Sequence, residues 1–205
     1  MQSLDKYLNQ IIEGDCRKIL KDFPDGSVDC VCSDVPYNIA TGGVAGIKKG
    51  IRTGGILNRQ DLENSKDLKK KWLRKDASKD NVDFITSGKF FENVPKFEEW
   101  LPEVYRILKD GSHCYLMINA RNIKELQTKA EEAGFKYLNL LVWKKQNRTP
   151  NKYYQQGCEF ILMLRKGYAK NIKDMGKSNV FEITNPIGNK FHPNEKPVQL
   201  MKEMI

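Results

Sequence analysis

The feature that most constrains the fold is an alternation of two hydrophobic periods along the chain. Short, β-prone apolar segments, which are typical of buried strands, alternate with segments whose apolar residues recur at helical spacing. The predicted strands cover residues 28–33, 114–118, 137–143 and 159–164. A strand, helix, strand, helix, strand order predicts an α/β fold in which helices cover the faces of one sheet.

Two of the predicted helices lie between these strands. The first has apolar residues at i, i+4, i+7 and i+11, namely Phe97, Leu101, Val104 and Leu108. Gly111 is expected to end it in the left-handed conformation. The second begins near Asn122 and ends at Gly134, and a third begins at residue 198. Because no helix separates the last two strands, they can pair antiparallel as a hairpin at one edge of the sheet.

Composition narrows the class of protein. A chain of 205 residues with 30% charged and 40% hydrophobic residues fits one soluble globular domain. No apolar run reaches the roughly 20 residues of a membrane span, and the N-terminus has no apolar signal core. Five cysteines without a CxxC pair indicate reduced thiols in a cytoplasmic protein, and the two histidines have no metal-ligand spacing. The net charge of +9 favours a polyanion such as nucleic acid as partner, although many basic proteins bind none.

A basic insertion is predicted over residues 42–89, and it is a candidate DNA-contact region. It holds several glycines and then a run of cations around Trp72. The candidate DNA-binding residues are Lys69, Lys70, Lys71 and Arg74 in this run, with Arg148 and Lys152 in a later polar loop. Basic surfaces that include aromatic residues suit nucleic acid. The alternative for the lysine run is a solvated helix face.

The tetrapeptide Asp34-Val35-Pro36-Tyr37 directly follows the first predicted strand. Asp34 and Tyr37 therefore lie at the carboxyl end of a sheet strand, where open α/β sheets bind their ligands. Taken alone, the tetrapeptide is more typical of a strand that runs into a proline turn. Its surroundings change that interpretation.

Seven segments occur in an order that resembles β-class DNA amino-methyltransferases. They are Gly14–Cys16, Phe23–Asp29, Asp34–Tyr37, Phe97–Gly111, Val142–Lys145, Glu159–Leu162 and His192–Pro197. The family shows a GD(A/C) turn, an LPDxSVD stretch, a strand that ends in DPPY, and HPTxKP. Other amino-methyltransferases place a cofactor glycine loop before the catalytic motif, and the 33 residues that precede Asp34 are too few for it. The resemblance implies a Rossmann-like S-adenosylmethionine-dependent methyltransferase sheet over residues 1–205.

The resemblance also implies catalytic roles for Asp34, Val35, Pro36 and Tyr37. The Asp34 carboxylate and the Val35 carbonyl would each accept a hydrogen from the target amine, and the carboxylate would stabilise the positive charge that develops on nitrogen. Tyr37 would stack on a base that has left the duplex. The family has Pro where this chain has Val35, but a backbone oxygen can come from either residue, and Pro36 favours extended geometry before it. Aspartate at position 34 favours adenine N6 over cytosine N4, because the cytosine members more often carry Ser there.

The cofactor implied by the resemblance is S-adenosylmethionine. Its expected binding residues are Asp15, Cys16, Asp34, Lys196 and Pro197. Asp15 matches the acidic residue that contacts the adenine amine, and Lys196 and Pro197 match the motif beside the methionine moiety. The alternatives are a turn and helix cap at Asp15 and a proline-initiated helix start at Pro197.

The family's cofactor loop, DPFxGSG, would follow the helix that begins at residue 198, and no FxGxG occurs in this sequence. We therefore expect a sheet that is incomplete at its C-terminus, weak S-adenosylmethionine binding and no methyl transfer by this chain alone. A shortened expression product, a truncated gene, or a homodimer partner or complementing chain would each account for this. DNA is the expected partner, and no association with a membrane is expected. Besides a methyltransferase, a non-catalytic DNA-binding remnant and one half of a split enzyme remain alternatives.

If the lysine run contacts phosphates, replacing Lys69, Lys70, Lys71 and Arg74 with Gln will weaken DNA binding equally across sequences. The log–log dependence of affinity on salt will flatten by about 0.9 for each phosphate that is no longer neutralised, because fewer counterions are released. Titrations of labelled duplexes at several salt concentrations measure the slope. An unchanged slope would assign the run to a solvated helix face.

Overall fold

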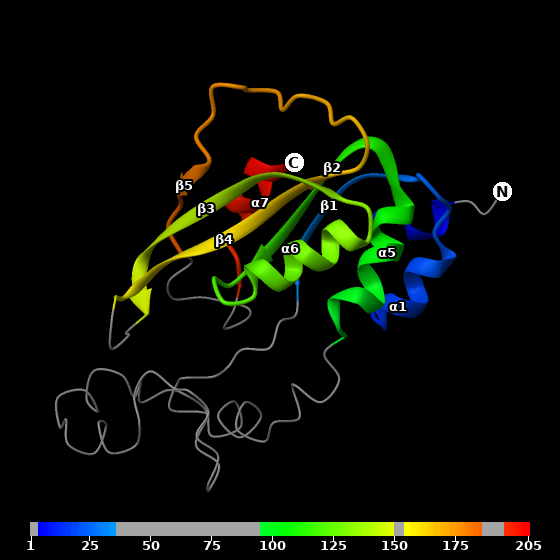
Figure 1. The fold of residues 1–205 in the computed structure, drawn as a ribbon, viewed down its shortest axis with the longest axis horizontal. Coiled ribbons are helices and arrows are strands. Elements are labelled where there is room, and N and C mark those ends of the chain that lie inside the picture. The colour runs from blue at the N-terminus through cyan, green and yellow to red at the C-terminus, as the bar shows by residue number, and fades with distance from the viewer. Residues whose placement is uncertain (1–3, 36–94, 150–153, 186–194) are drawn as a thin grey trace, which may run out of the picture. The chain divides into compact units, whose positions relative to one another are not determined.

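The computed structural model describes residues 4–35, 95–149, 154–185 and 195–205 (Figure 1). The chain forms two compact units. The first comprises residues 1–35, 95–147 and 157–205, and the second comprises residues 36–94 and 148–156. The predicted insertion over residues 42–89 lies outside the described residues. The elements that follow belong almost entirely to the first unit.

Five strands form one mixed sheet in the order β1-β2-β4-β3-β5. Their bounds are β1 Val28–Asp34, β2 Leu108–Ile118, β3 Lys136–Thr149, β4 Gln156–Arg165 and β5 Val180–Glu182. β1 pairs with β2 in parallel, β2 with β4 antiparallel, and β3 with β5 in parallel. The predicted mixed α/β sheet is therefore confirmed. The short β5 was not predicted, because three residues are too few to show a hydrophobic period. It pairs with β3 at the edge of the sheet (Figure 1).

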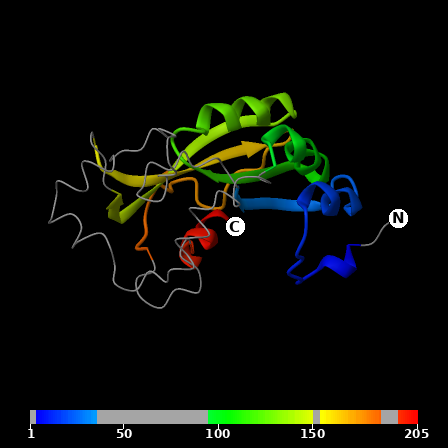
Figure 2. The same cartoon turned by 90° about the horizontal axis from the view of Figure 1, so that it is seen from below.

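Helices cover both faces of this sheet. α5 (Phe97–Ile107) and α6 (Ile123–Glu132) lie on one face, and α7 (Val198–Met204) lies on the other (Figure 2). Short helical turns, η1 (Asp5–Tyr7), α1 (Cys16–Ile19) and η2 (Leu20–Asp22), precede β1. Gly134 follows α6 with φ +105°, as the predicted helix end requires.

The predicted end of α5 is wrong. The helix stops at Ile107, and Leu108 is already extended and paired with Val28 of β1. Gly111 does have the expected positive φ, +79°, but it lies inside β2, where its N–H donates to the Lys166 carbonyl over 2.9 Å. Pairing with β1 therefore ends the helix earlier than the apolar stripe suggested.

Alternate residues of the middle strands face opposite helices. On the α7 side, one buried cluster contains Tyr115, Met117, Leu141, Trp143, Ile161, Met163, Phe181, Leu200 and Met204. The alternate residues Cys114, Leu116, Ile118, Leu162 and Leu164 are buried as well. Strands covered on both faces need continuous apolar segments, and this explains why the sequence of β2 and β4 shows no polar alternation.

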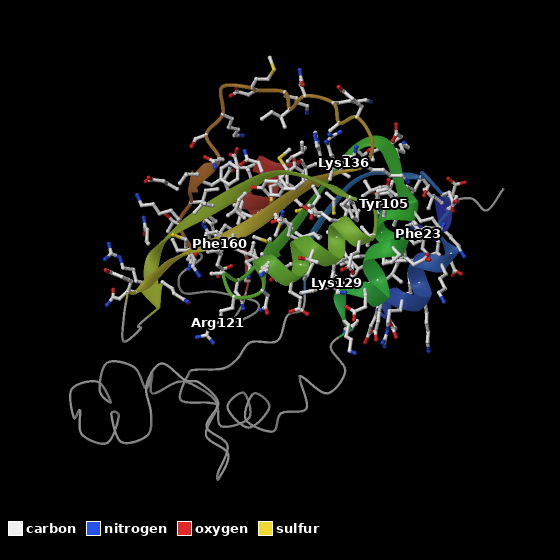
Figure 3. The ribbon with its side chains drawn as sticks, in the orientation of Figure 1. Phe23, Tyr105, Arg121, Lys129, Lys136 and Phe160 are labelled. Atoms are coloured by element: carbon white, nitrogen blue, oxygen red, sulfur yellow. The ribbon has the colours of Figure 1, made fainter. Side chains whose placement is uncertain are left out.

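Lys166 stabilises the junction where α5 passes into β2. Its Nζ donates to the carbonyl oxygens of Tyr105 at 2.8 Å, Arg106 at 3.2 Å and Leu108 at 2.7 Å. The same Nζ lies 4.8 Å from the centroid of the Tyr105 ring, and that ring packs edge-on against Phe135. Tyr105 is labelled on α5 in Figure 3. A cation at this end satisfies carbonyls that have no partner within the helix and interacts favourably with the helix dipole.

Replacing Lys166 with Met should lower the free energy of unfolding by about 1–3 kcal/mol, because carbonyls that accept from a charged group lose their donor. Urea denaturation followed by circular dichroism measures the change. Lys129→Met is the matched control, since Lys129 pairs with Glu132 on α6, and this substitution should change stability much less. Equal effects of the two substitutions would contradict the assigned role of Lys166.

Candidate functional site

The predicted catalytic aspartate occupies the last position of β1. Asp34 pairs with Met117 of β2, and its side chain is 38% exposed. The next residue, Val35, is 2% exposed, so its apolar side chain anchors the backbone just after the strand. Pro36 and Tyr37 lie outside the described residues. The structure therefore provides a reachable carboxylate on a firmly held strand end.

Lys196 is the cation beside this carboxylate. Its Nζ lies 3.0 Å from Oδ2 of Asp34, and its side chain is only 13% exposed. Lys196 immediately precedes Pro197, the N-cap residue of α7. The start of α7 is therefore held at the carboxyl end of β1. Asp34 and Lys196, two of the residues expected to bind the cofactor, are brought into direct contact.

Glu159 of β4 extends this contact into a larger group of charges. Its Oε2 lies 3.3 Å from Nζ of Lys196, and its Oε1 accepts a hydrogen bond from Nζ of Lys145 on β3. We call these four side chains, Asp34, Lys196, Glu159 and Lys145, the charge network. Phe160, labelled in Figure 3, marks the part of β4 in which Glu159 lies. The network contains two carboxylates and two ammonium groups, so its formal charges cancel.

The environment of Glu159 favours its ionised form. Burial acts to raise the pKa of this carboxyl, but the hydrogen bond from Lys145 and the charge of Lys196 together outweigh burial and hold the pKa below its usual value. The side chain is 24% exposed, and that of Lys145 is 13% exposed. Charges this far removed from water are tolerated because each one has an opposite charge at contact distance.

Asp15 has a local structural role in the described residues. It is the N-cap residue of α1, and its Oδ1 accepts from the Arg17 backbone N–H over 2.9 Å. The Arg17 guanidinium also binds both Asp15 oxygens and reaches Glu99 of α5. The hydrogen bond from Arg17 lowers the pKa of Asp15. The alternative of a turn and helix cap is thus present, and contact between Asp15 or the exposed Cys16 and a cofactor stays a prediction.

The candidate DNA-binding residues fall largely outside the described part of the chain. Arg148, which is exposed near the end of β3, is the exception. Residues Lys69, Lys70, Lys71, Arg74 and Lys152 lie outside the described residues, as does His192. Within the described ranges, no group of three or more His, Cys, Asp or Glu side chains could hold a metal ion. Among the same residues, no helix has the length and apolar character needed to cross a membrane.

Sequence reasoning assigned no role to Glu159 or Lys145, although both lie in segments that carried the resemblance. The alternation of side chains along β3 and β4 contained a signal for both residues. Lys145 alternates with the buried Leu141 and Trp143, and Glu159 alternates with the buried Ile161. Charged residues on the buried face of a strand require a partner, so these two positions pointed to a buried ion pair.

Comparisons with known proteins give one consistent picture. The model of the family described as DNA methylase (N6_N4_Mtase) matches residues 28–205. The Type II methyltransferase M.HinfI of Haemophilus influenzae is 29% identical over 150 residues, which cover 73% of this chain and 35% of the relative. The Type II methyltransferase M2.MboI of Moraxella bovis is 25% identical over 168 residues, which cover 80% of this chain and 52% of the relative.

The fold has counterparts among solved structures. The crystal structure of M1.HpyAVI is similar with a TM-score of 0.56 and 19% sequence identity, covering 95% of this chain and 72% of that chain. An identity this low supports the fold alone. The chain spans 35% and 52% of the length of the two curated relatives.

The lowered pKa of Glu159 predicts a contribution to acid sensitivity. A carboxyl whose folded pKa lies below its unfolded value of about 4.5 stabilises the fold above that pH, and this stabilisation is lost as pH falls through the folded pKa. Between pH 6 and about pH 3, the stability of Glu159→Gln should therefore fall less steeply than that of the unmodified chain. Urea midpoints across this pH range measure the slopes. Glu182→Gln, which alters an exposed pair with Lys144, should leave the slope nearly unchanged, and equal slopes for all three proteins would contradict the prediction.

Proposed function

Because the chain belongs to the DNA methylase family, we propose that it carries the catalytic centre of a DNA amino-methyltransferase that transfers a methyl group from S-adenosylmethionine to an exocyclic base amine. The observation that carries the proposal is the Asp34 carboxylate, which is reachable at the carboxyl end of β1 and held by Lys196 over 3.0 Å. Ligands of open α/β sheets bind at this end of the strands. The DNA methylase family match over residues 28–205 includes Asp34 and Lys196.

The chemistry requires a group such as Asp34. The lone pair of an exocyclic amine is delocalised into the base, which makes the nitrogen a poor nucleophile. A carboxylate that accepts one of its hydrogens, with the Val35 carbonyl accepting the other, favours a pyramidal nitrogen with an available lone pair. The same carboxylate stabilises the positive charge that develops on the nitrogen. The buried Val35 side chain supports a fixed position for its carbonyl.

The residues around Asp34 fit the methionine end of S-adenosylmethionine. That end carries a carboxylate, an ammonium group and the sulfonium that supplies the electrophilic methyl group. Lys196 and Asp34 offer one charge of each sign at contact distance, which suits the carboxylate and the ammonium group respectively. Pro197 and the start of α7 position Lys196. Asp15 and Cys16 remain our candidates for the adenine end.

Adenine N6 is the target amine that we favour, because position 34 carries Asp. Cytosine N4 is the alternative within the same family. Base chemistry of this kind requires the target nucleotide to leave the stack, and Tyr37 is the proposed stacking residue. We place the reaction in the cytoplasm, where DNA is available and the free thiols of this chain are stable.

Replacing Asp34 with Ala should lower the rate of methyl transfer by about a hundredfold or more, because the developing charge loses its stabilising group. Transfer from tritium-labelled S-adenosylmethionine to unmethylated genomic DNA is measured with the full-length protein. Digestion of the product to nucleosides distinguishes N6-methyladenine from N4-methylcytosine.

Asp29→Ala is the matched control for this substitution. Asp29 also lies on β1, but it is exposed and pairs with Lys109 over 2.6 Å. It should retain near-normal activity. Near-normal transfer by Asp34→Ala would remove Asp34 from the mechanism, and no transfer by the unsubstituted full-length protein would contradict the proposed function.

A further inference from the structure

We infer that Glu159 is a positioning residue for the proposed methyl transfer, which holds the Lys196 ammonium beside Asp34 by joining it to Lys145. The inference rests on the proposed function for its consequence, but its geometry stands independently of activity. Each Glu159 oxygen has its own cation: Oε1 faces Lys145 and Oε2 faces Lys196. A single carboxylate thus links β3, β4 and the residue that precedes Pro197.

Burial makes this link necessary. The side chains of Lys145 and Lys196 are each 13% exposed, whereas Asp34 is 38% exposed. Without the Glu159 charge, the charge network would keep two poorly hydrated ammonium groups, Lys145 and Lys196, and a single carboxylate, Asp34. Removing one partner of a buried ion pair leaves an uncompensated charge, and keeping that charge away from water costs free energy. Lys196 would then turn toward solvent, and this change would disturb the carboxylate proposed to accept from the base amine.

The Lys145 side of the link is anchored in the core. Nζ of Lys145 lies 5.5 Å from the ring centroid of Trp143, which is 2% exposed. Nε1 of Trp143 donates to the Ile183 carbonyl over 2.8 Å. Leu200 and Met204 of α7 belong to the same buried cluster as Trp143. Glu159 therefore connects Lys196 to Lys145, which lies beside the buried cluster.

The neighbouring pair of Lys144 and Glu182 provides a matched control. It joins the same two residue types over 2.7 Å and begins one residue earlier on β3. Both side chains are largely exposed, at 57% and 70%. Lys144 and Lys145 point to opposite faces of the strand, so Glu182 lies away from the charge network. Glu182→Gln thus removes one carboxylate from a lysine without altering the link to Lys196.

The first experiment measures the position of Lys196 in the chain itself. Brief acetylation with dilute acetic anhydride, quantified at each lysine by mass spectrometry, reports how readily each amine leaves its ion pair and reacts. Glu159→Gln should raise the acetylation rate of Lys196 by about tenfold, which corresponds to the loss of one hydrogen bond to a charged group. Glu182→Gln should raise the rate at Lys144 and leave Lys196 unchanged.

A double substitution, Lys145→Met with Glu159→Gln, keeps the inference testable if the single variant unfolds. It removes one charge of each sign and leaves Lys196 with Asp34. Lys196 should again react faster, while circular dichroism confirms that the fold is retained. An unchanged rate at Lys196 in the folded variant would overturn the inference, since Glu159 would then not be what holds the lysine.

The second experiment measures methyl transfer to unmethylated DNA by the same full-length protein. Glu159→Gln should lower kcat by about tenfold and change the KM for DNA less than threefold, because the defect lies beside the reacting amine and leaves DNA contacts intact. A raised KM for DNA with unchanged kcat would overturn the positioning role. If the unsubstituted protein transfers no methyl group, the proposed function fails, whereas the acetylation result still decides whether Glu159 positions Lys196.

Discussion

Burial of both faces of the middle strands is the constraint on which the rest of the structure depends. Residues 114–118 of β2 and 161–164 of β4 are buried throughout, so helices must cover the sheet on both sides. α5 and α6 cover one face, and α7 covers the other (Figure 2). Apolar burial of this kind contributes about 1.5–3 kcal/mol for each large side chain. It fixes the places where β1 and α7 can lie.

The charge network is a consequence of that arrangement. Once β1 lies beside β2 and α7 packs on the sheet, Asp34 and Lys196 meet at 3.0 Å, although they are far apart in the chain. Glu159 and Lys145 come from strands that must be adjacent for the core to close. Buried ion pairs add little net stability, since desolvation offsets attraction. Their position beside the proposed catalytic carboxylate is therefore better explained by placement of charge than by stabilisation.

Much of the fold could be predicted from the sequence, since the hydrophobic periods locate β1, β2, α6, β3, β4 and α7, although β2, β3 and β4 extend beyond the predicted residues. The end of α5 could not be predicted, because pairing between Leu108 and Val28 competes with the helix and has no local signal. Two members of the charge network, Asp34 and Lys196, were predicted as site residues through motif resemblance. Glu159 and Lys145 were assigned no role, although both are charges at buried strand positions.

The sequence by itself determined the fold class, the position of Asp34 at the end of a strand and the excess of positive charge. These properties follow from local periodicity and composition, which do not depend on the contacts between distant segments of the chain. Only the tertiary structure decided that Lys196 contacts Asp34, that Glu159 joins two lysines, and that Arg17 binds the Asp15 carboxylate. The reason is physical: an ion pair depends on distances between segments, and those distances are set by the packing of the whole core.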